Sequence, residues 1–255
     1  MENDAWGAHL TVPIARGVHG VRSISTRLEP EAWCCRLRPP LHEYLSSGRR
    51  GMNLWHCLDH PVLWEVSRIW LDLAFGLYRK RMKLMQAWGI LEGHPSVLDI
   101  GCGIGQYATI TEGDYLGVDL NERYITYARR RHRRPNQSFL RMDVNTLREE
   151  KRMFSLVLMV DFLHHLSDEQ CVAILTTASQ LAKSYVVSFE PITHQPYPLG
   201  RWIVENDRGG YVRSLEHLHR LFEEPRLPIL RSIPLRLGPI NTRAVLCRPE
   251  KANAS

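Results

Sequence analysis

A glycine-rich turn and one downstream acid are the residues of this 255-residue chain best suited to hold a small molecule. Gly101, Gly103 and Gly105 follow directly after the apolar segment 97–100. Glycines remove side chains where a backbone turns tightly and lies against a ligand. Asp119 comes eighteen positions after Gly101, at the end of the apolar segment 115–118. An acid at the carboxyl end of a strand can hydrogen-bond both hydroxyls of a ribose, so the spacing favours a nucleoside-containing ligand.

The turn alone fits two classes of ligand. A dinucleotide-binding turn ends G-x-G-x-x-G on a third glycine, where helix and strand pack closely around a pyrophosphate. Gln106 stands at that position here, and the extra glycine, Gly105, comes one place earlier. Asp99 adds a carboxylate inside the preceding strand, two residues before the first glycine. These departures favour a cofactor other than NAD.

Motifs in the right order over about 90 residues resemble those of the class I S-adenosylmethionine-dependent methyltransferases, of the standalone bacterial methyltransferase-domain type. The pattern Asp-x-Gly-x-Gly-x-Gly from Asp99 resembles their motif I, and residues 115–120 resemble motif II. Residues 139–144 resemble the strand whose final acid meets adenine, and residues 154–168 resemble the fourth strand and the segment after it. The resemblance implies S-adenosyl-L-methionine as cofactor and a Rossmann-like, doubly wound α/β fold. Its sheet would have seven strands, mostly parallel with a C-terminal antiparallel hairpin.

The resemblance places the cofactor at the carboxyl ends of the first strands. The glycine turn would accept the methionine portion, and Asp119 would hold the ribose hydroxyls. Asp143 would accept from the adenine amino group beside the backbone N–H of Val144; alternatively, it caps the short turn that follows. Asp99 would bind backbone N–H groups of the turn or the donor's amino group. The cofactor-binding set is Asp99, Gly101, Gly103, Gly105, Asp119, Leu120, Asp143, Val144 and Val160.

Two histidines follow the fourth strand and are the candidate catalytic residues. A free imidazole titrates near pH 6.5, so His164 or His165 could take a proton from an acceptor hydroxyl. Residues 164–168 resemble the His-x-Trp-x-Asp segment of plant-type O-methyltransferases, whose first histidine is the base. Leu166 replaces the tryptophan here, and the dimerisation domain of those enzymes is missing. The alternative is a histidine pair that only shapes the wall of the cleft.

A segment rich in aromatics and arginines, residues 190–213, is predicted to lie beside the cleft as a substrate lid. Aromatic rings beside guanidinium groups suit an anionic or aromatic acceptor. Residues 207–213 resemble a sequence in the same standalone bacterial group. An ordered surface lid held by ion pairs explains the composition equally well. The predicted substrate-binding residues are Tyr197, Arg201, Arg208, Tyr211 and Arg213.

Composition narrows the class of protein. The net charge is +6, and the densest basic run, residues 129–134, has no interleaved aromatics for base stacking. We interpret it as the end of a helix, where cations complement the helix dipole, and expect no nucleic acid partner. The six cysteines show no metal-binding spacing, so we predict reduced thiols and no metal site. No apolar run is long enough to span a bilayer, and no secretory signal is evident, which predicts a cytoplasmic protein.

The chain divides into three predicted parts. Residues 1–51 form an extension with no sustained period, which could be disordered, and residues 52–92 form an N-terminal helical cap. Its helical pattern runs over 54–89. The resemblance implies that Tyr78 and Arg79 face the methionine end of the cofactor; the alternative is a core helix with a solvated basic edge of Arg79, Lys80, Arg81 and Lys83. Residues 93–250 form the methyltransferase domain. We expect its strands at about 97–100, 115–119, 138–142, 154–160, 184–189, 227–237 and 242–247, with helices between the parallel ones.

These observations favour a cytoplasmic enzyme that methylates a small molecule on oxygen or carbon. No Asn/Asp-Pro-Pro-Tyr/Phe or Pro-Cys motif follows the fourth strand, which weakens nucleic acid substrates. The charge keeps an RNA or protein methyltransferase open as an alternative. Ser155, where relatives usually carry aspartate, keeps open a catalytically inactive, cofactor-binding partner subunit. The acceptor and the oligomeric state are not predicted.

Overall fold

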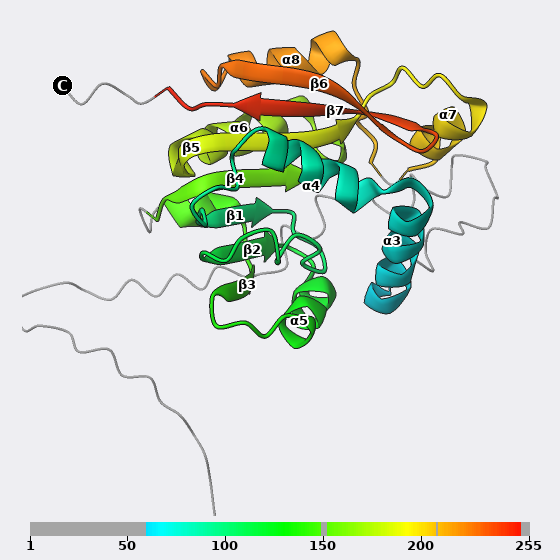
Figure 1. Cartoon of the computed structure of the whole chain (residues 1–255). Helices are drawn as coiled ribbons and strands as arrows, with labels where there is room; N and C mark the ends of the chain where they lie inside the picture. The colour runs from blue at the N-terminus through cyan, green and yellow to red at the C-terminus, as the bar shows by residue number, and fades with distance from the viewer. Residues whose placement is uncertain (1–59, 149–151, 208, 251–255) are drawn as a thin grey trace, which may run out of the picture. The chain divides into compact units, whose positions relative to one another are not determined.

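The computed structural model describes residues 60–148, 152–207 and 209–250, so the predicted extension over 1–51 lies outside the described residues. Figure 1 shows a central sheet with helices on both sides. The described helices are α3 (Pro61–Phe75), α4 (Leu77–Ala87), α5 (Glu122–Arg131), α6 (Asp168–Leu181), α7 (Pro198–Glu205) and α8 (Leu215–Glu223), with 3-10 turns η2 (Val144–Arg148) and η3 (Leu163–His165). The strands are β1 (Val97–Ile100), β2 (Tyr115–Asp119), β3 (Gln137–Arg141), β4 (Phe154–Val160), β5 (Ala182–Pro191), β6 (Ile229–Leu237) and β7 (Ile240–Cys247).

The sheet has the predicted topology. Its seven strands lie in the order β3-β2-β1-β4-β5-β7-β6. The first five are mutually parallel, and β7 pairs antiparallel with both β5 and β6. The C-terminal hairpin therefore closes the sheet as expected. The parallel strands bring their carboxyl ends, and the loops that follow them, to one edge of the sheet.

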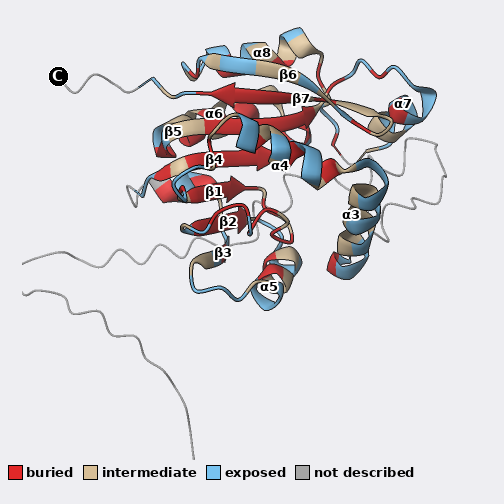
Figure 2. Ribbon diagram, viewed as in Figure 1, coloured by how far each residue is buried: buried red, intermediate tan, exposed pale blue. Residues whose placement is uncertain are grey.

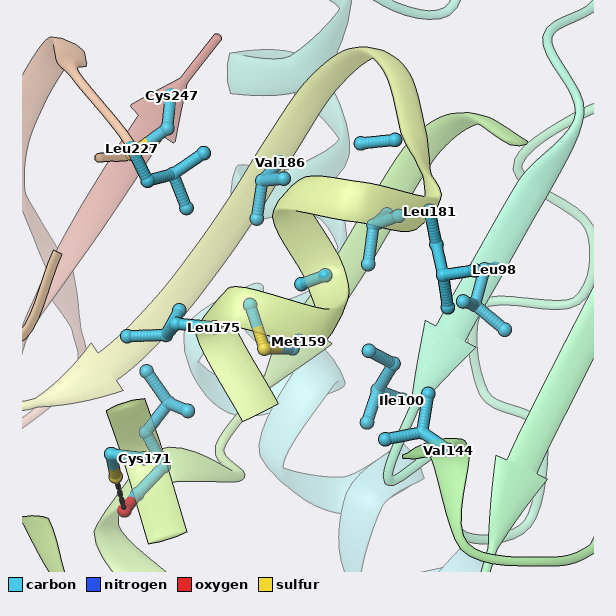
Figure 3. Close-up of a cluster of buried hydrophobic side chains, with 14 of the residues drawn as sticks. Leu98, Ile100, Val144, Met159, Cys171, Leu175, Leu181, Val186, Leu227 and Cys247 are labelled. Carbon is cyan, nitrogen blue, oxygen red and sulfur yellow. Dashed lines mark hydrogen bonds between the residues drawn. The ribbon is translucent and has the colours of Figure 1, made fainter. Parts of the chain in front are cut away.

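The two faces of the sheet carry separate hydrophobic clusters. Alternate strand residues point to opposite faces, so Leu98 and Ile100 of β1 pack on one side while Val97 packs on the other. The first side is covered by α6 and α8, and Figure 3 shows Leu175 and Leu181 of α6 against Met159 and Leu98. The second side is covered by α4 and α5. This two-sided burial explains why the central strands read as nearly continuous apolar runs.

Polar side chains cap the starts of several described helices. Asn121 caps α5 by accepting from the backbone of Arg123 and Tyr124. Ser167 and Gln170 form a capping box at the start of α6. Ser214 caps α8 by accepting from the backbone of His217. These polar side chains satisfy N–H groups that have no partner inside their own helix.

Three parts of the predicted secondary structure were wrong. The helical pattern over 54–89, of which 54–59 lie outside the described residues, is not continuous: Gly76, whose left-handed backbone has φ 67°, ends α3 and begins α4. Between β1 and β2 the chain makes a series of turns where a helix was expected. Helix α7 lies in the segment interpreted as a loop lid.

Several apolar side chains on α3 and α7 face solvent. In Figure 2 the central strands β1 and β4 are mostly red (buried), whereas α3 and α7 are mostly tan and pale blue. On α3 the exposed fraction reaches 68% for Trp70 and 66% for Leu73, and on α7 it is 55% for Trp202. Within the described part of the chain, no helix is long and apolar enough to cross a membrane.

Candidate cofactor and acceptor site

The glycine turn after β1 requires glycine at specific places. Gly101, Gly103 and Gly105 all have positive φ, a conformation that other residues adopt only at a cost. A Cβ at Gly101 would collide with the ring of Phe162, and one at Gly105 would press on Phe139. A Cβ at Gly103 would meet no atom within 4 Å, which leaves open space beside the middle of the turn. The turn is therefore packed at both ends and open in the middle.

Asp119 is fixed to this turn. Its Oδ2 accepts the backbone N–H of Gly103 at 2.9 Å, and its Oδ1 accepts that of Asn121 at 2.8 Å. Burial raises the pKa of Asp119, although the two backbone hydrogen bonds oppose the shift. The carboxylate thus joins the end of β2 to the turn after β1, and part of it stays accessible.

Asp99 is more deeply buried than its predicted role requires. Only 1% of the residue is exposed, and its Oδ2 accepts a hydrogen bond from the Tyr115 hydroxyl at 2.5 Å. Burial raises the pKa of Asp99 to about 7 despite this hydrogen bond. The Asp99 carboxyl therefore bonds to a side chain of the neighbouring strand β2 rather than to the glycine turn. A cofactor contact by Asp99 stays a prediction.

The remaining predicted cofactor residues lie near the same edge of the sheet. Asp143 accepts from the backbone N–H and the side-chain amide of Asn145, both at 2.9 Å, which is the capping alternative. Val144 is buried in the core, Leu120 is 46% exposed, and Val160 is half-buried at the end of β4. Both hydrogen bonds to Asp143 use Oδ1, so its Oδ2 could still contact a ligand. The roles of all these residues toward a cofactor stay predictions.

A buried ion pair that sequence analysis missed lies beside the turn. Arg81 of α4 is 1% exposed and donates to both carboxylate oxygens of Asp161, at 3.0 and 2.7 Å. It also donates to the Tyr107 hydroxyl at 3.2 Å. Burial alone raises the pKa of Asp161, but Arg81 and Arg68 outweigh it and lower the pKa below its usual value. Asp161 directly follows β4 and has a left-handed backbone (φ 51°).

The prediction of a solvated basic edge on α4 is wrong for Arg81. Arg79 is exposed and pairs with Asp72, but Arg81 turns inward toward Asp161. A second arginine, Arg68 of α3, donates to the same carboxylate at 3.1 Å. Tyr78 meets the turn region through a 3.4 Å contact of its hydroxyl with Thr109. Helices α3 and α4 are thus tied to the end of β4, as a cap over the site would be.

His164 is held between two carboxylates. Its Nδ1 lies 2.8 Å from Oε2 of Glu190, and its Nε2 lies 2.9 Å from Oδ2 of Asp207. Burial alone would lower the pKa of His164, but hydrogen bonds to Asp207 and Glu190 outweigh it and raise the pKa to about 10. An imidazole that donates from both nitrogens has no lone pair for an acceptor proton. The base role of His164 stays a prediction, and this geometry argues against it.

His165 and Glu190 complete this cluster. The exposed ring of His165 lies 4.2 Å from the ring of His164, centroid to centroid. Glu190 ends β5 and is 2% exposed. Its Oε1 accepts backbone N–H groups of Phe162 and Leu163 at 3.0 and 2.9 Å, so one glutamate organises the whole turn after β4. Sequence analysis missed Glu190 because it reads as the end of a strand.

The predicted substrate-binding residues divide into buried and exposed sets. Arg213 is 5% exposed and donates to the carbonyls of Leu163 and Leu166 and to Asp168. Its guanidinium is committed to holding the fold, so a substrate-binding role for Arg213 is not supported. Tyr197 and Tyr211 are exposed, as is Arg201 on α7, and their roles stay predictions. Arg208 lies outside the described residues.

The basic run 129–134 ends α5 as expected. Arg129 donates to the Phe139 carbonyl, and Arg131 pairs with Glu65 of α3. A hollow of about 750 Å³ lies between these helices and is lined by His60, Pro61, Val62, Glu122, Arg123, Thr126, Tyr127, Arg130 and Arg131. No residue of the glycine turn is among those that line it.

The fold and the site together define a class. The sheet order, the glycine turn after β1 and the acid after β2 are those of a Rossmann-like methyltransferase fold. Similar solved structures include a TehB-like SAM-dependent methyltransferase from Corynebacterium glutamicum ATCC 13032 (TM-score 0.56, 15% identity, 75% of this chain and 99% of that one). Another is magnesium protoporphyrin IX methyltransferase from Synechocystis PCC 6803 with bound SAH (TM-score 0.52, 18% identity, 66% and 80%). At these identities the likeness shows the fold alone.

Sequence comparison identifies the domain. Residues 97–184 match the family described as "Methyltransferase domain". Phthiotriol/phenolphthiotriol dimycocerosates methyltransferase of Mycobacterium tuberculosis is 35% identical over 77 residues, which are 28% of this chain and 28% of that protein. Over residues 97–184 the chain is thus similar to a methyltransferase-domain family, as its motifs predicted, and the whole sheet has the Rossmann-like methyltransferase fold. The match spans less than a third of the curated relative's length.

Proposed function

We propose that this protein transfers the methyl group of S-adenosyl-L-methionine to oxygen or carbon of a small-molecule acceptor. The observation that carries the proposal is the Asp119 carboxylate, which accepts the Gly103 N–H and so stands between the glycine turn and the end of β2. A ribose bound there would replace or share that hydrogen bond. The methionine portion would lie in the open space beside Gly103.

The residues present fit this cofactor. An acid at the end of β2, an open glycine turn and a second acid at the end of β3 match the ribose, methionine and adenine portions in that order. When bound, the cofactor supplies an activated methyl on a sulfonium. The protein then needs to align an acceptor with that methyl and to exclude water. We expect the Arg81–Asp161 pair, and Phe162 packed on Gly101, to serve the second need.

We propose an acceptor with a large apolar part. Trp202 and Leu199 on α7 and Tyr197 before it expose between 43% and 56% of their surface. A cluster of exposed apolar side chains is typical of a binding surface. The curated relatives are named for phthiotriol and phenolphthiotriol dimycocerosates, and a hydrophobic acceptor for this chain is consistent with that similarity. No particular acceptor is implied.

His164 acts in this proposal by position rather than as a base. Its contacts with Glu190 and Asp207 fix the turn after β4, from which Asp161 and Phe162 reach the site. Turnover of a folded His164→Gln variant is expected to fall by about tenfold or less, without recovery at high pH. A loss of about 10²–10⁴-fold that recovers as the acceptor ionises would restore the base role.

The two alternatives have less support. In the basic run that suggested an RNA or protein substrate, Arg129 donates to the Phe139 carbonyl and Arg131 pairs with Glu65 on the surface. Ser155, which suggested an inactive partner subunit, hydrogen-bonds Ser96 near the start of β4. This end of β4 is remote from the glycine turn, so a serine in place of an aspartate there does not deprive the proposed site of a carboxylate.

Cofactor binding and methyl transfer are tested separately. S-adenosylhomocysteine is expected to raise the melting temperature of the full-length protein, whereas NAD is not. Labelled methyl from S-adenosylmethionine should then appear on a member of a panel of hydrophobic phenols, alcohols and enols. Stabilisation by NAD with none by S-adenosylhomocysteine would overturn the proposal. Cofactor binding with no transfer to any panel member, and RNA or protein labelled instead, would favour the first alternative.

A further inference from the structure

A second cluster of ligand-type side chains lies outside the proposed cofactor site. His164 and His165 belong to η3, and Asp207 lies just after α7, more than forty residues along the chain. Each can offer one ligand atom, and these atoms all lie within 4.8 Å of one another. The separation in sequence explains why no metal-binding spacing was evident.

The cluster also has the outer partner that metal-binding histidines use. A ligating imidazole usually donates its other ring N–H to a carboxylate, which fixes the ring and its tautomer. Here the carboxylate is that of Glu190, whose Oε2 lies 2.8 Å from Nδ1 of His164. Its own orientation is fixed by backbone N–H groups of Phe162 and Leu163. The Nε2 atom of His164 is thereby directed at Asp207, 2.9 Å away.

The charges at this place favour a cation. Two carboxylates, from the buried Glu190 and the partly exposed Asp207, flank one buried imidazole ring. A proton on Nε2 provides the positive charge when no other cation is present. A divalent ion coordinated by Nε2 would provide more, and the proton would leave to solvent as it bound.

We propose that His164, His165 and Asp207 bind one divalent transition-metal ion, with Glu190 orienting His164. Two imidazoles and one carboxylate suit zinc, iron, cobalt or nickel, whereas magnesium and calcium prefer oxygen ligands. Metal–nitrogen bonds of about 2.0–2.1 Å require the ligand atoms to approach by a small movement of the exposed His165. Three protein ligands leave at least one coordination position open.

The surrounding backbone gives this site a function in the fold. A Cβ at Gly209 would collide with the His164 ring, so the chain after Asp207 lies directly against it. The N–H of Tyr211 donates to the His164 carbonyl at 3.0 Å. An ion at Asp207 would therefore tie the segment after α7 to the turn after β4, and would order the side of the site that bears Tyr211.

The test is metal binding by the full-length protein. After dialysis against chelator, Zn²⁺ is titrated by calorimetry, and Co²⁺ is followed by its visible absorption. We expect one tight equivalent for the wild type and a loss of affinity of at least tenfold in His165→Ala, which alters an exposed side chain. His194→Ala, which removes another exposed histidine outside the cluster, is the matched control and should bind as the wild type does.

Two further variants keep the test decisive. Asp207→Asn should weaken binding as His165→Ala does, and Glu190→Gln should weaken it by about 10–100-fold, the range for outer-shell partners. Equal affinity in the wild type and His165→Ala would mean that the ion is held elsewhere, and would overturn the proposal. S-adenosylhomocysteine binding is measured on the same samples. Its presence or absence decides the proposed function and leaves the metal result unaffected.

Discussion

The two sides of the site are built in different ways. On the cofactor side the contacts are to backbone groups: Asp119 accepts the N–H of Asn121, two positions along the chain, and that of Gly103, 16 positions back. On the opposite side, buried ion pairs join charged side chains that are 80 positions apart for Arg81 and Asp161 and 26 apart for His164 and Glu190. The first side tolerates changes that keep the turn, whereas the second depends on each charge having its partner.

The largest effect should come from removing one charge of the buried side. Arg81→Leu leaves Asp161 with only the partial compensation of Arg68, so we expect the free energy of unfolding to fall by about 3–5 kcal/mol. Arg79→Leu, two positions earlier, removes an exposed pair with Asp72 and should cost about 1 kcal/mol or less. Urea unfolding of both variants measures the difference. Equal losses would show that burial does not distinguish the two arginines.

The same pair predicts an acid dependence. Because the folded pKa of Asp161 lies below its unfolded value, the stabilisation is complete above about pH 4 and is lost as the pH falls toward the folded pKa. The gap between wild type and Arg81→Leu should therefore narrow in acid. A gap that is constant from pH 7 to pH 3 would contradict the ion-pair explanation.

Asp99 should show the opposite sign. Its folded pKa of about 7 lies above the unfolded value, so between pH 4 and 7 the unfolded chain loses a proton that the folded chain keeps. Wild-type stability should fall relative to Asp99→Asn over that window, by about 2–4 kcal/mol, and level off above it. The exposed Asp114→Asn should stay within about 0.5 kcal/mol of wild type throughout. A flat difference for Asp99→Asn would show that the carboxyl is ionised when buried.

The smallest effect concerns a purely local device. Ser167→Ala removes the capping side chain of α6 and should lower the free energy of unfolding by about 1 kcal/mol. Ser179→Ala, inside the same helix, should change it by no more than about 0.5 kcal/mol. Thermal unfolding of both variants separates them. If Ser167→Ala lowered the free energy of unfolding as much as Arg81→Leu does, local and long-range contacts would not differ in the way proposed here.

The same contrast explains what the sequence could and could not predict. The turn at 101–105 could be predicted from its glycine spacing and Asp119 from its place at the end of a strand, although the contact between them spans 16 positions. Arg81 stands in a run of basic residues that looks solvated, and only the fold brings Asp161 to it. Likewise, only the fold brings Glu190 and Asp207 into contact with His164. The expected helix after β1 was wrong because the glycine turn continues as further turns.

The central claim is that Asp119 and the glycine turn hold S-adenosylmethionine. The most direct measurement is calorimetric titration of S-adenosylhomocysteine into wild type, Asp119→Ala and Asp114→Ala, the last an exposed aspartate just before the opposite end of β2. We predict that Asp119→Ala weakens binding by about 1.5–3 kcal/mol, the range for hydrogen bonds to a charged group, and that Asp114→Ala binds as the wild type does. Unchanged affinity in a folded Asp119→Ala variant would contradict the claim.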